Sequence, residues 1–150
     1  MTEANQRDLI EIYRLHAELA DKVSQRREGA NRLYVSLLVG LVVFLAALLR
    51  FGIADESLGA IMWLVGAVGV SLSISWTVVI RSYRQLNDGK FLALHELEER
   101  LPYPFFKREW ELLDEGRSAK RYWKLTTVEV ALPVIFFLLS WLLIVAAFLR

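Results

Sequence analysis

The sequence LGAIMWLVGAVGVSLSISWTVVI occupies residues 58–80 and contains no charged side chain. It is longer than the ~20 apolar residues that an α-helix needs to cross the hydrocarbon core of a bilayer. Apolar residues keep helical spacing beyond this stretch as far as residue 101, and no proline follows until Pro102. We therefore expect one continuous helix, with a weak point at Gly89, that leaves the membrane and continues into water.

Two more stretches, 33–53 and 127–149, are apolar enough for transmembrane helices. Residues 1–32 repeat apolar side chains at helical spacing among charges, which predicts an amphipathic helix. Residues 81–126 lie between the second and third spans and are predicted to be helical and cytosolic. The fold class is therefore an all-α integral membrane protein with three transmembrane helices, an amphipathic N-terminal helix and a helical cytosolic insertion between spans 2 and 3.

The distribution of lysine and arginine predicts the orientation of the chain. Sixteen of the 18 Lys and Arg residues fall in segments 1–32 and 81–126, and the other two are Arg50 and Arg150. Because positive residues stay on the cytoplasmic side, both segments are expected inside the cell. The N-terminus would then be cytoplasmic, and the C-terminus would lie on the outer side of the membrane.

Small residues occupy two faces of the second span. Such residues let helix backbones approach closely in lipid, where van der Waals packing drives association. We predict that these faces pack against other helices or other subunits, although small residues are also common in spans. The residues are Ala67, Ser71 and Ser75 on one face and Gly66, Gly69 and Ser73 on the other. Trp63 and Trp76 lie near the span ends, where they are interpreted as interfacial anchors.

Apolar stripes in the two polar segments have no large core of their own, so they are expected to bury one another or to meet a neighbouring subunit. The residues predicted to pack in this way are Tyr83, Leu86, Leu94, Leu97 and Trp110. Glu96, Glu98 and Glu99 are interpreted as a solvated helix face. Thr126 and Glu129 have the spacing of a capping box at the start of the third span.

Catalytic chemistry has little support in the sequence. There is no cysteine, and no HExxH, GxSxG, phosphate-loop or GxGxxG motif is present. His16 and His95 are each close to carboxylates, so a pH-sensing role is one interpretation and an ordinary packed histidine is the other. No span has an ionisable residue in its middle, which argues against charge-coupled transport. We expect no enzyme activity and no cofactor.

The net charge of +1 provides no overall basic field, so nucleic acid is not an expected partner. Two aromatic residues are flanked by two basic residues in 121–124, immediately before the third span. Such a pattern is typical of contact with anionic headgroups at the cytosolic face. The expected partners are therefore membrane lipids and other copies of the chain.

A pattern of spaced residues covers most of the chain. It consists of Ser75-Trp76, Ile80-Arg81-Ser82-Tyr83-Arg84-Gln85-Leu86-Asn87, Lys90-Phe91, His95-Glu96-Leu97-Glu98, Leu101-Pro102, Glu109-Trp110, Leu113, Gly116, Tyr122, Leu125-Thr126, Glu129 and Pro133. This pattern resembles the RipA family of octameric bacterial membrane proteins. The resemblance implies a homo-octamer of the bacterial inner membrane, with the C-terminus on the periplasmic side, and it brings no catalytic residue.

The resulting hypothesis is a non-enzymatic, homo-octameric membrane protein that acts as a scaffold or as an assembly related to stress or host adaptation. A weaker likeness, to two-span effector domains of bacterial conflict systems, supports an alternative. In that alternative the protein is a multisubunit channel or a membrane-disrupting defence effector. The third span departs from the effector pattern.

Overall fold

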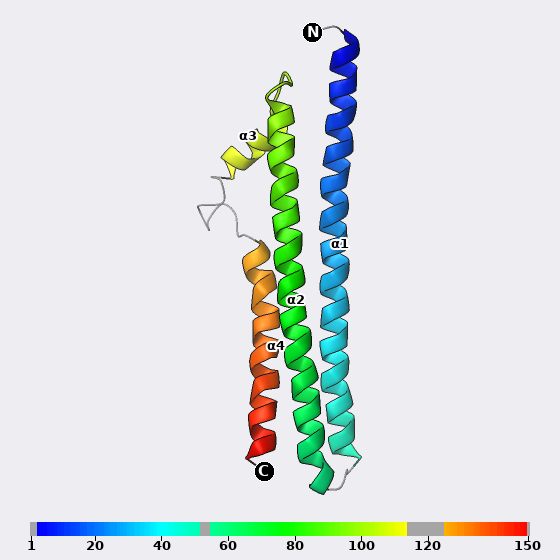
Figure 1. The fold of residues 1–150 in the computed structure, drawn as a ribbon, viewed down its shortest axis with the longest axis vertical. Helices are drawn as coiled ribbons and strands as arrows, with labels where there is room; N and C mark the ends of the chain where they lie inside the picture. The colour runs from blue at the N-terminus through cyan, green and yellow to red at the C-terminus, as the bar shows by residue number, and fades with distance from the viewer. Residues whose placement is uncertain (1–2, 52–54, 114–124, 150) are drawn as a thin grey trace. The chain divides into compact units, whose positions relative to one another are not determined.

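A computed structural model describes residues 3–51, 55–113 and 125–149. They form four helices: α1 (Glu3–Arg50), α2 (Asp55–Glu98), α3 (Phe105–Leu112) and α4 (Leu125–Phe148) (Figure 1). The helices α1, α2 and α4 each contain a stretch long and apolar enough to cross a membrane. The predicted all-α fold with three candidate spans is confirmed.

The two longest helices contain both polar and apolar sequence. The helix α1 runs for 48 residues and joins the predicted amphipathic helix to the first span without a break. The helix α2 runs for 44 residues through Gly89, which confirms the predicted continuity. Since neither helix contains proline, every interior residue keeps the N–H group that the helical hydrogen-bond ladder requires.

The end of α2 falls at Glu98, three residues before the predicted end. The N–H groups of Arg100 and Leu101 donate to the carbonyls of Leu97 and Glu98, three residues earlier, which tightens the last turn. Pro102 and Pro104 follow, and a proline disfavours helical conformation in the residue before it.

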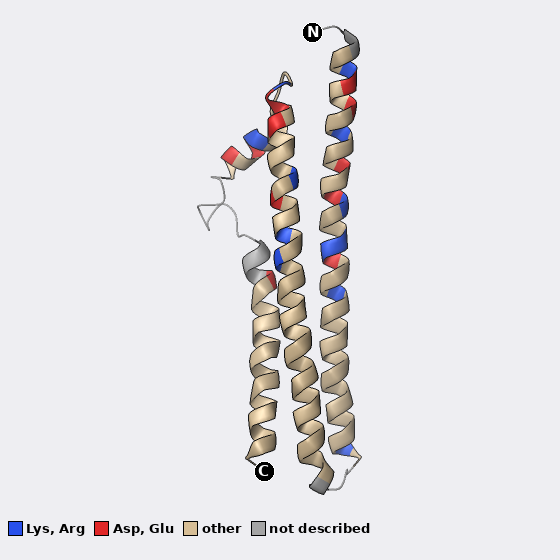
Figure 2. Cartoon of the chain, viewed as in Figure 1, with Lys and Arg blue, Asp and Glu red and all other residues tan. Residues whose placement is uncertain are grey.

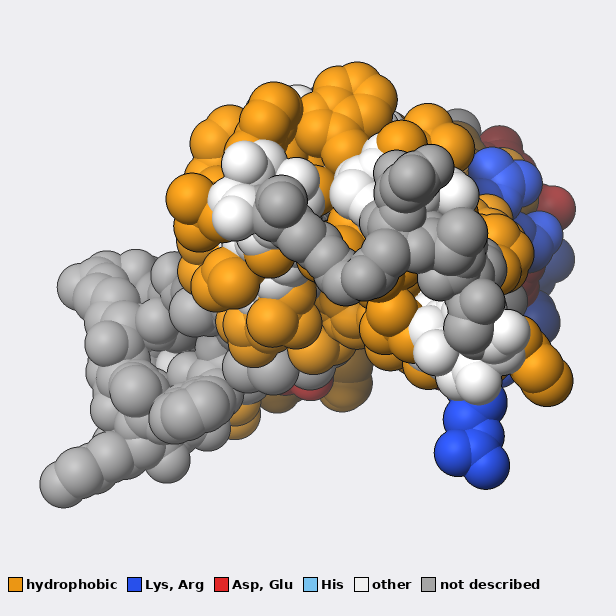
Figure 3. Space-filling model, turned by 90° about the horizontal axis from the view of Figure 1, so that it is seen from below, with side chains coloured by type: hydrophobic (Ala, Val, Ile, Leu, Met, Phe, Trp, Pro, Cys, Tyr) orange, Lys and Arg blue, Asp and Glu red, His pale blue; other side chains and the backbone are white. Residues whose placement is uncertain are grey.

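The chain divides into two compact units. The polar unit comprises Met1–Glu28 and Arg81–Thr127, and the apolar unit comprises Gly29–Ile80 and Val128–Arg150. Most charged side chains lie on the segments of the polar unit (Figure 2). Hydrophobic side chains cover the surface at the end of the apolar unit where the C-terminus lies (Figure 3), and a lipid-facing surface has this composition.

In the apolar unit, α2 contacts both of the other helices. Its buried core combines Leu38 of α1 with Trp76 and Ile80 of α2, and Val130 and Phe136 of α4 pack against it. In the polar unit, the first part of α1, the last part of α2 and the short helix α3 come together. Ala20, Val23 and Leu94 are buried there.

Candidate functional site

The most completely enclosed charged group among the described residues is the carboxylate of Glu98, the last residue of α2. Its side chain is 0% exposed. Its Oε1 atom accepts two hydrogen bonds, one from the Tyr13 hydroxyl at 2.8 Å and one from the Phe106 N–H at 2.7 Å. The second oxygen accepts from the Lys107 N–H at 3.0 Å. Glu98 therefore connects α1, α2 and α3 within the polar unit.

The position of Glu98 follows from a shortage of acceptors at the start of α3. The first N–H groups of any helix lack partners inside the helix. Pro104, at the N-cap position, provides no side-chain cap. The Glu98 carboxylate takes over this task for two N–H groups, and its negative charge also favours the positive end of the helix dipole. Hydrogen bonds to a charged acceptor are about twice as strong as neutral ones.

The Tyr13 hydroxyl is held in its protonated form. Burial, then the hydrogen bond to Glu98 and then the charge of that carboxylate raise the pKa of Tyr13 well above its ordinary value of 10.0. The folded state therefore retains this proton more strongly than the unfolded state. The stability contributed by this proton is fully present below pH 10 and is lost as the pH rises toward the folded-state pKa.

Aromatic rings surround this carboxylate. The ring of Phe106 lies 6.1 Å from that of Tyr13 and 5.7 Å from that of Phe91, edge-on in the second case. These spacings are typical of favourable aromatic pairs. The rings bring apolar area from all three helices to the place where the charge is enclosed, and they exclude water from it.

The interpretation of Glu96, Glu98 and Glu99 as a solvated face is wrong for Glu98. Its neighbours Glu96 and Glu99 are exposed, as expected. Glu98 lies on the buried stripe of α2, one helical turn after Leu94. The signal that sequence reasoning missed was a helix starting after Pro104 with no Ser, Thr, Asp or Asn to cap it.

A second polar cluster lies in the apolar unit. The indole N–H of Trp76 donates to the side-chain oxygen of Asn31 at 2.8 Å, and the amide nitrogen of Asn31 donates to Glu129 at 3.2 Å. The ring of Tyr34 stacks on Trp76 with centroids 5.9 Å apart. Side chains of α1, α2 and α4 thus fix the relative register of the three helices at this level.

This cluster corrects one sequence interpretation. Trp76 is only 1% exposed, so it is a core residue and not an interfacial anchor, whereas Trp63 is 47% exposed. The carboxylate of Glu129 accepts a hydrogen bond from Asn31 of another helix. The side chain of Thr126, the other member of the predicted capping box, lies outside the described residues, so the capping box stays a prediction.

The predicted small-residue faces of α2 have different surroundings. Gly66 and Gly69 lie against α4, where a Cβ on Gly66 would come within 2.9 Å of the Ser140 carbonyl oxygen and one on Gly69 would collide with the Ser140 hydroxyl. The buried Ser73 donates to the Gly69 carbonyl at 2.8 Å. This face is therefore occupied within one chain.

The other small face of α2 is open in the single chain. Ala67 is half-buried, whereas Ser71 and Ser75 are exposed. The Ser71 hydroxyl donates to the Ala67 carbonyl one turn earlier at 2.8 Å. Because that bond satisfies the hydroxyl locally, Ser71 can meet another apolar surface without leaving its polar hydrogen unpaired.

The residues predicted to pack in the polar region are placed as follows. Leu94 is 0% exposed, and Tyr83 and Leu97 are half-buried. Leu86 and Trp110 are 50% and 39% exposed within one chain. Packing of the last two against a neighbouring subunit stays a prediction.

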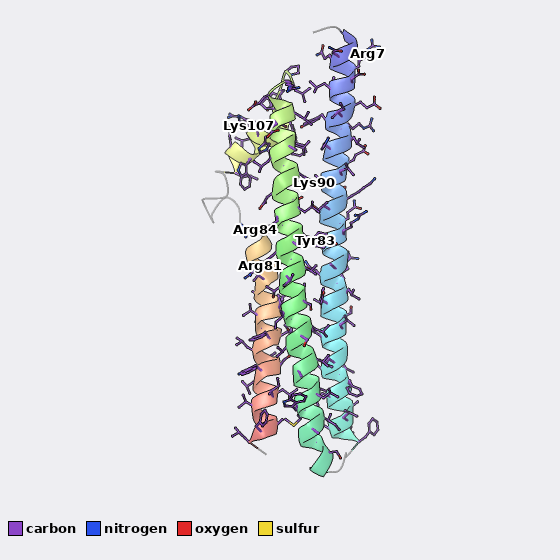
Figure 4. All side chains as sticks on the ribbon, in the orientation of Figure 1. Arg7, Arg81, Tyr83, Arg84, Lys90 and Lys107 are labelled. Carbon is purple, nitrogen blue, oxygen red and sulfur yellow. The ribbon has the colours of Figure 1, made fainter. Side chains whose placement is uncertain are left out.

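Tyr83 and Lys90 lie on the side of α2 that faces α1, while Arg81 and Arg84 lie on the other side and are exposed (Figure 4). His16 and His95 are both half-buried, and their pH-sensing role stays a prediction. No three of the His, Asp and Glu side chains within the described ranges gather into a cluster that could hold a metal ion.

These features define a three-span helical membrane protein with a compact polar unit. The model of the octameric membrane protein family (8xMP) matches residues 10–149, and the chain belongs to this family. The match does not confirm the more specific resemblance to RipA. No curated protein and no solved structure matches the chain.

The Glu98 contacts predict a local effect of substitution. Replacing Glu98 by Ala leaves two N–H groups of α3 and the Tyr13 hydroxyl without their acceptor, and each buried unsatisfied group costs roughly 1–3 kcal/mol. We expect faster hydrogen exchange at the first amides of α3 in Glu98→Ala, measured by mass spectrometry in detergent. Glu99→Ala removes an exposed carboxylate one residue away and serves as the control. Equal protection of α3 in both variants would contradict the capping role.

The close approach of α2 and α4 predicts that alanine at Gly66 lowers the stability of the fold, whereas alanine at Gly40 does not. Gly66→Ala places a methyl group against the backbone of Ser140 and the side chain of Ile144. Overpacking of this kind typically costs about 1–3 kcal/mol. Gly40→Ala meets nothing within 4 Å and should be neutral or slightly stabilising, since alanine favours helix. Unfolding midpoints followed by circular dichroism in detergent should fall only for Gly66→Ala.

Proposed function

We propose that this protein is a non-enzymatic homo-octamer of the bacterial inner membrane that acts as a scaffold, in an assembly that serves stress or host adaptation. Membership in an octameric family supports the self-association. The observation that carries the proposal is the apolar surface of the polar unit. Large apolar residues there are exposed in the single chain, and burying such a surface from water stabilises association. They include Ile12, Leu15, Leu86, Leu92 and Leu112.

The proposed orientation places the polar unit in the cytoplasm. The concentration of Lys and Arg in this unit supports it, since positive segments are retained on that side. Arg81 and Arg84 are exposed at the start of the polar part of α2, directly after the span, where they can contact anionic headgroups. In this arrangement the protein presents eight copies of a helical cytosolic surface at fixed spacing, which suits a scaffold.

The assembly is tested by native mass spectrometry in detergent, where we expect a mass of eight chains. Ser71→Leu fills the open small face of α2 and should reduce the octamer fraction while leaving the helix content unchanged. Ser36→Leu makes the same change at an exposed position of α1 and should leave the octamer intact. A purified wild-type chain that is monomeric in several detergents would refute the proposed function.

The alternative function is a channel or a membrane-disrupting effector. The observation in its favour is that Ser71 and Ser75 are exposed in the single chain, at a depth in the span where hydroxyl groups can line a water path between subunits. Some polar lining is needed for conduction, but a hydroxyl that is satisfied within its own helix, as that of Ser71 is, also suits tight packing.

Conductance separates the two functions. Purified octamer reconstituted in a planar bilayer should give no single-channel currents if the protein is a scaffold. Currents that Ser75→Leu abolishes, with the octamer intact, would replace the scaffold by the channel. Ser36→Leu is again the matched control.

A further inference from the structure

The polar unit has two exposed apolar surfaces that carry opposite charge. The first, the acidic α1 surface, is centred on Ile12 and Leu15, which are 47% and 55% exposed. The charged residues three or four positions from them, on the same face of α1, are Asp8, Glu11 and Glu18, and all three are carboxylates. Glu18 lies 3.3 Å from the guanidinium of Arg14. This surface is therefore apolar at its centre and negative at its rim.

The second, the basic α3 surface, is centred on Tyr103 and Phe105, which are 63% and 57% exposed. Residues 100–108 contain three cationic side chains, those of Arg100, Lys107 and Arg108, and no acidic one. All three are exposed, and Lys107 is labelled at α3 in Figure 4. Arg108 pairs with Glu111 at 2.8 Å, and the exposed Glu109 lies one helical turn after Phe105, so the positive charge of the rim comes from Arg100 and Lys107, at the N-terminal side of α3.

The structure holds the basic α3 surface in place. The N–H groups of Phe106 and Lys107 are bound to the buried Glu98, and the ring of Phe106 packs on Phe91. With Phe106 turned inward, its neighbour Phe105 is left outward and exposed. The surface is therefore presented by a fixed backbone, which lowers the entropy cost of binding.

A ring of identical subunits requires two different contact surfaces on each subunit. A ring of identical subunits around a fourfold or eightfold axis is built from heterologous contacts, in which one patch of a subunit meets a different patch of the next. The polar unit supplies two patches of similar apolar character, on different helices and of opposite charge. Like-charged contacts of either patch with itself would be repulsive.

We propose that the basic α3 surface of one subunit docks on the acidic α1 surface of a second copy of this chain. Tyr103 and Phe105 would pack on Ile12 and Leu15, and the cationic rim would meet carboxylates such as Asp8 and Glu11. The inference rests on the proposed octamer. It identifies the contact that joins the polar units of neighbouring subunits. The two ideas can fail separately, because an octamer can form through the spans alone.

The chain contains no cysteine, so introduced thiols report a single contact. Leu15→Cys and Tyr103→Cys are made in separate chains with different affinity tags, co-expressed and treated in membranes with a short bismaleimide cross-linker. We expect an adduct that carries both tags, on the order of tenfold above background because a fixed contact raises the effective thiol concentration. The control pairs Tyr103→Cys with Gln25→Cys, at an exposed polar residue of α1 outside both surfaces.

An intact octamer with no mixed adduct, or with as much adduct for the control pair, would overturn the docking proposal and leave the proposed function standing. Loss of the octamer in native mass spectrometry would instead refute the proposed function. The membrane is the other conceivable partner of a basic, aromatic surface. Quenching of a fluorophore on Tyr103→Cys by spin-labelled lipids, with no mixed adduct, would assign the surface to the membrane and overturn docking between subunits.

Discussion

A carboxylate that water cannot reach must find its hydrogen bonds inside the protein, and Glu98 is such a group. An ionised side chain in a low-dielectric interior is tolerated only when donors surround it. Glu98 has a tyrosine hydroxyl and two backbone N–H groups of α3. The dependence is mutual, because the N–H groups of α3 would otherwise be unsatisfied. The position of α3, and with it the outward direction of Phe105, follows from this exchange.

The apolar unit solves a related problem with the neutral side chains of Trp76 and Asn31 and the carboxylate of Glu129. Trp76 and Asn31 bring polar atoms into a helix bundle that has little water to solvate them, and they satisfy each other across α1 and α2. Such bonds contribute on average only about 0.6 kcal/mol each in membrane proteins. Their main effect is to fix register, while close contact at Gly66 and Gly69 provides the dispersion energy that holds α4 on α2.

The sequence was sufficient for the features that depend on local pattern. Three apolar stretches predicted three spanning helices, and unbroken helical spacing predicted that α2 continues past the span through Gly89. The continuity of α1 was not predicted, because residues 1–32 and 33–53 were interpreted as an amphipathic helix and a separate first span. A change from charged to apolar sequence does not by itself end a helix, and α1 runs through Gly29 without a break.

The features that were missed depend on residues far apart in the chain. Glu98 looked like its exposed neighbours Glu96 and Glu99, and only the return of α3 after Pro104 encloses it. Trp76 stood near the end of a span, where tryptophan often faces the interface. Its partner Asn31 lies 45 residues away, so no local pattern could place the two together. Gly66 and Gly69 were expected to pack against a neighbouring helix, but the sequence did not indicate that α4 is the helix they contact.

The two units can stabilise association between subunits in different ways, the apolar unit by close packing in lipid and the polar unit by burying apolar area from water. In lipid, apolar burial gains little, so the open face of Ala67, Ser71 and Ser75 can contribute only through close packing. In water, exposed side chains such as Leu15 and Phe105 gain free energy simply by leaving the solvent. A helix face with small residues fits many partners, whereas two apolar surfaces of opposite charge fit each other in one orientation. The polar unit is therefore the part of the chain best equipped to determine which copy meets which surface.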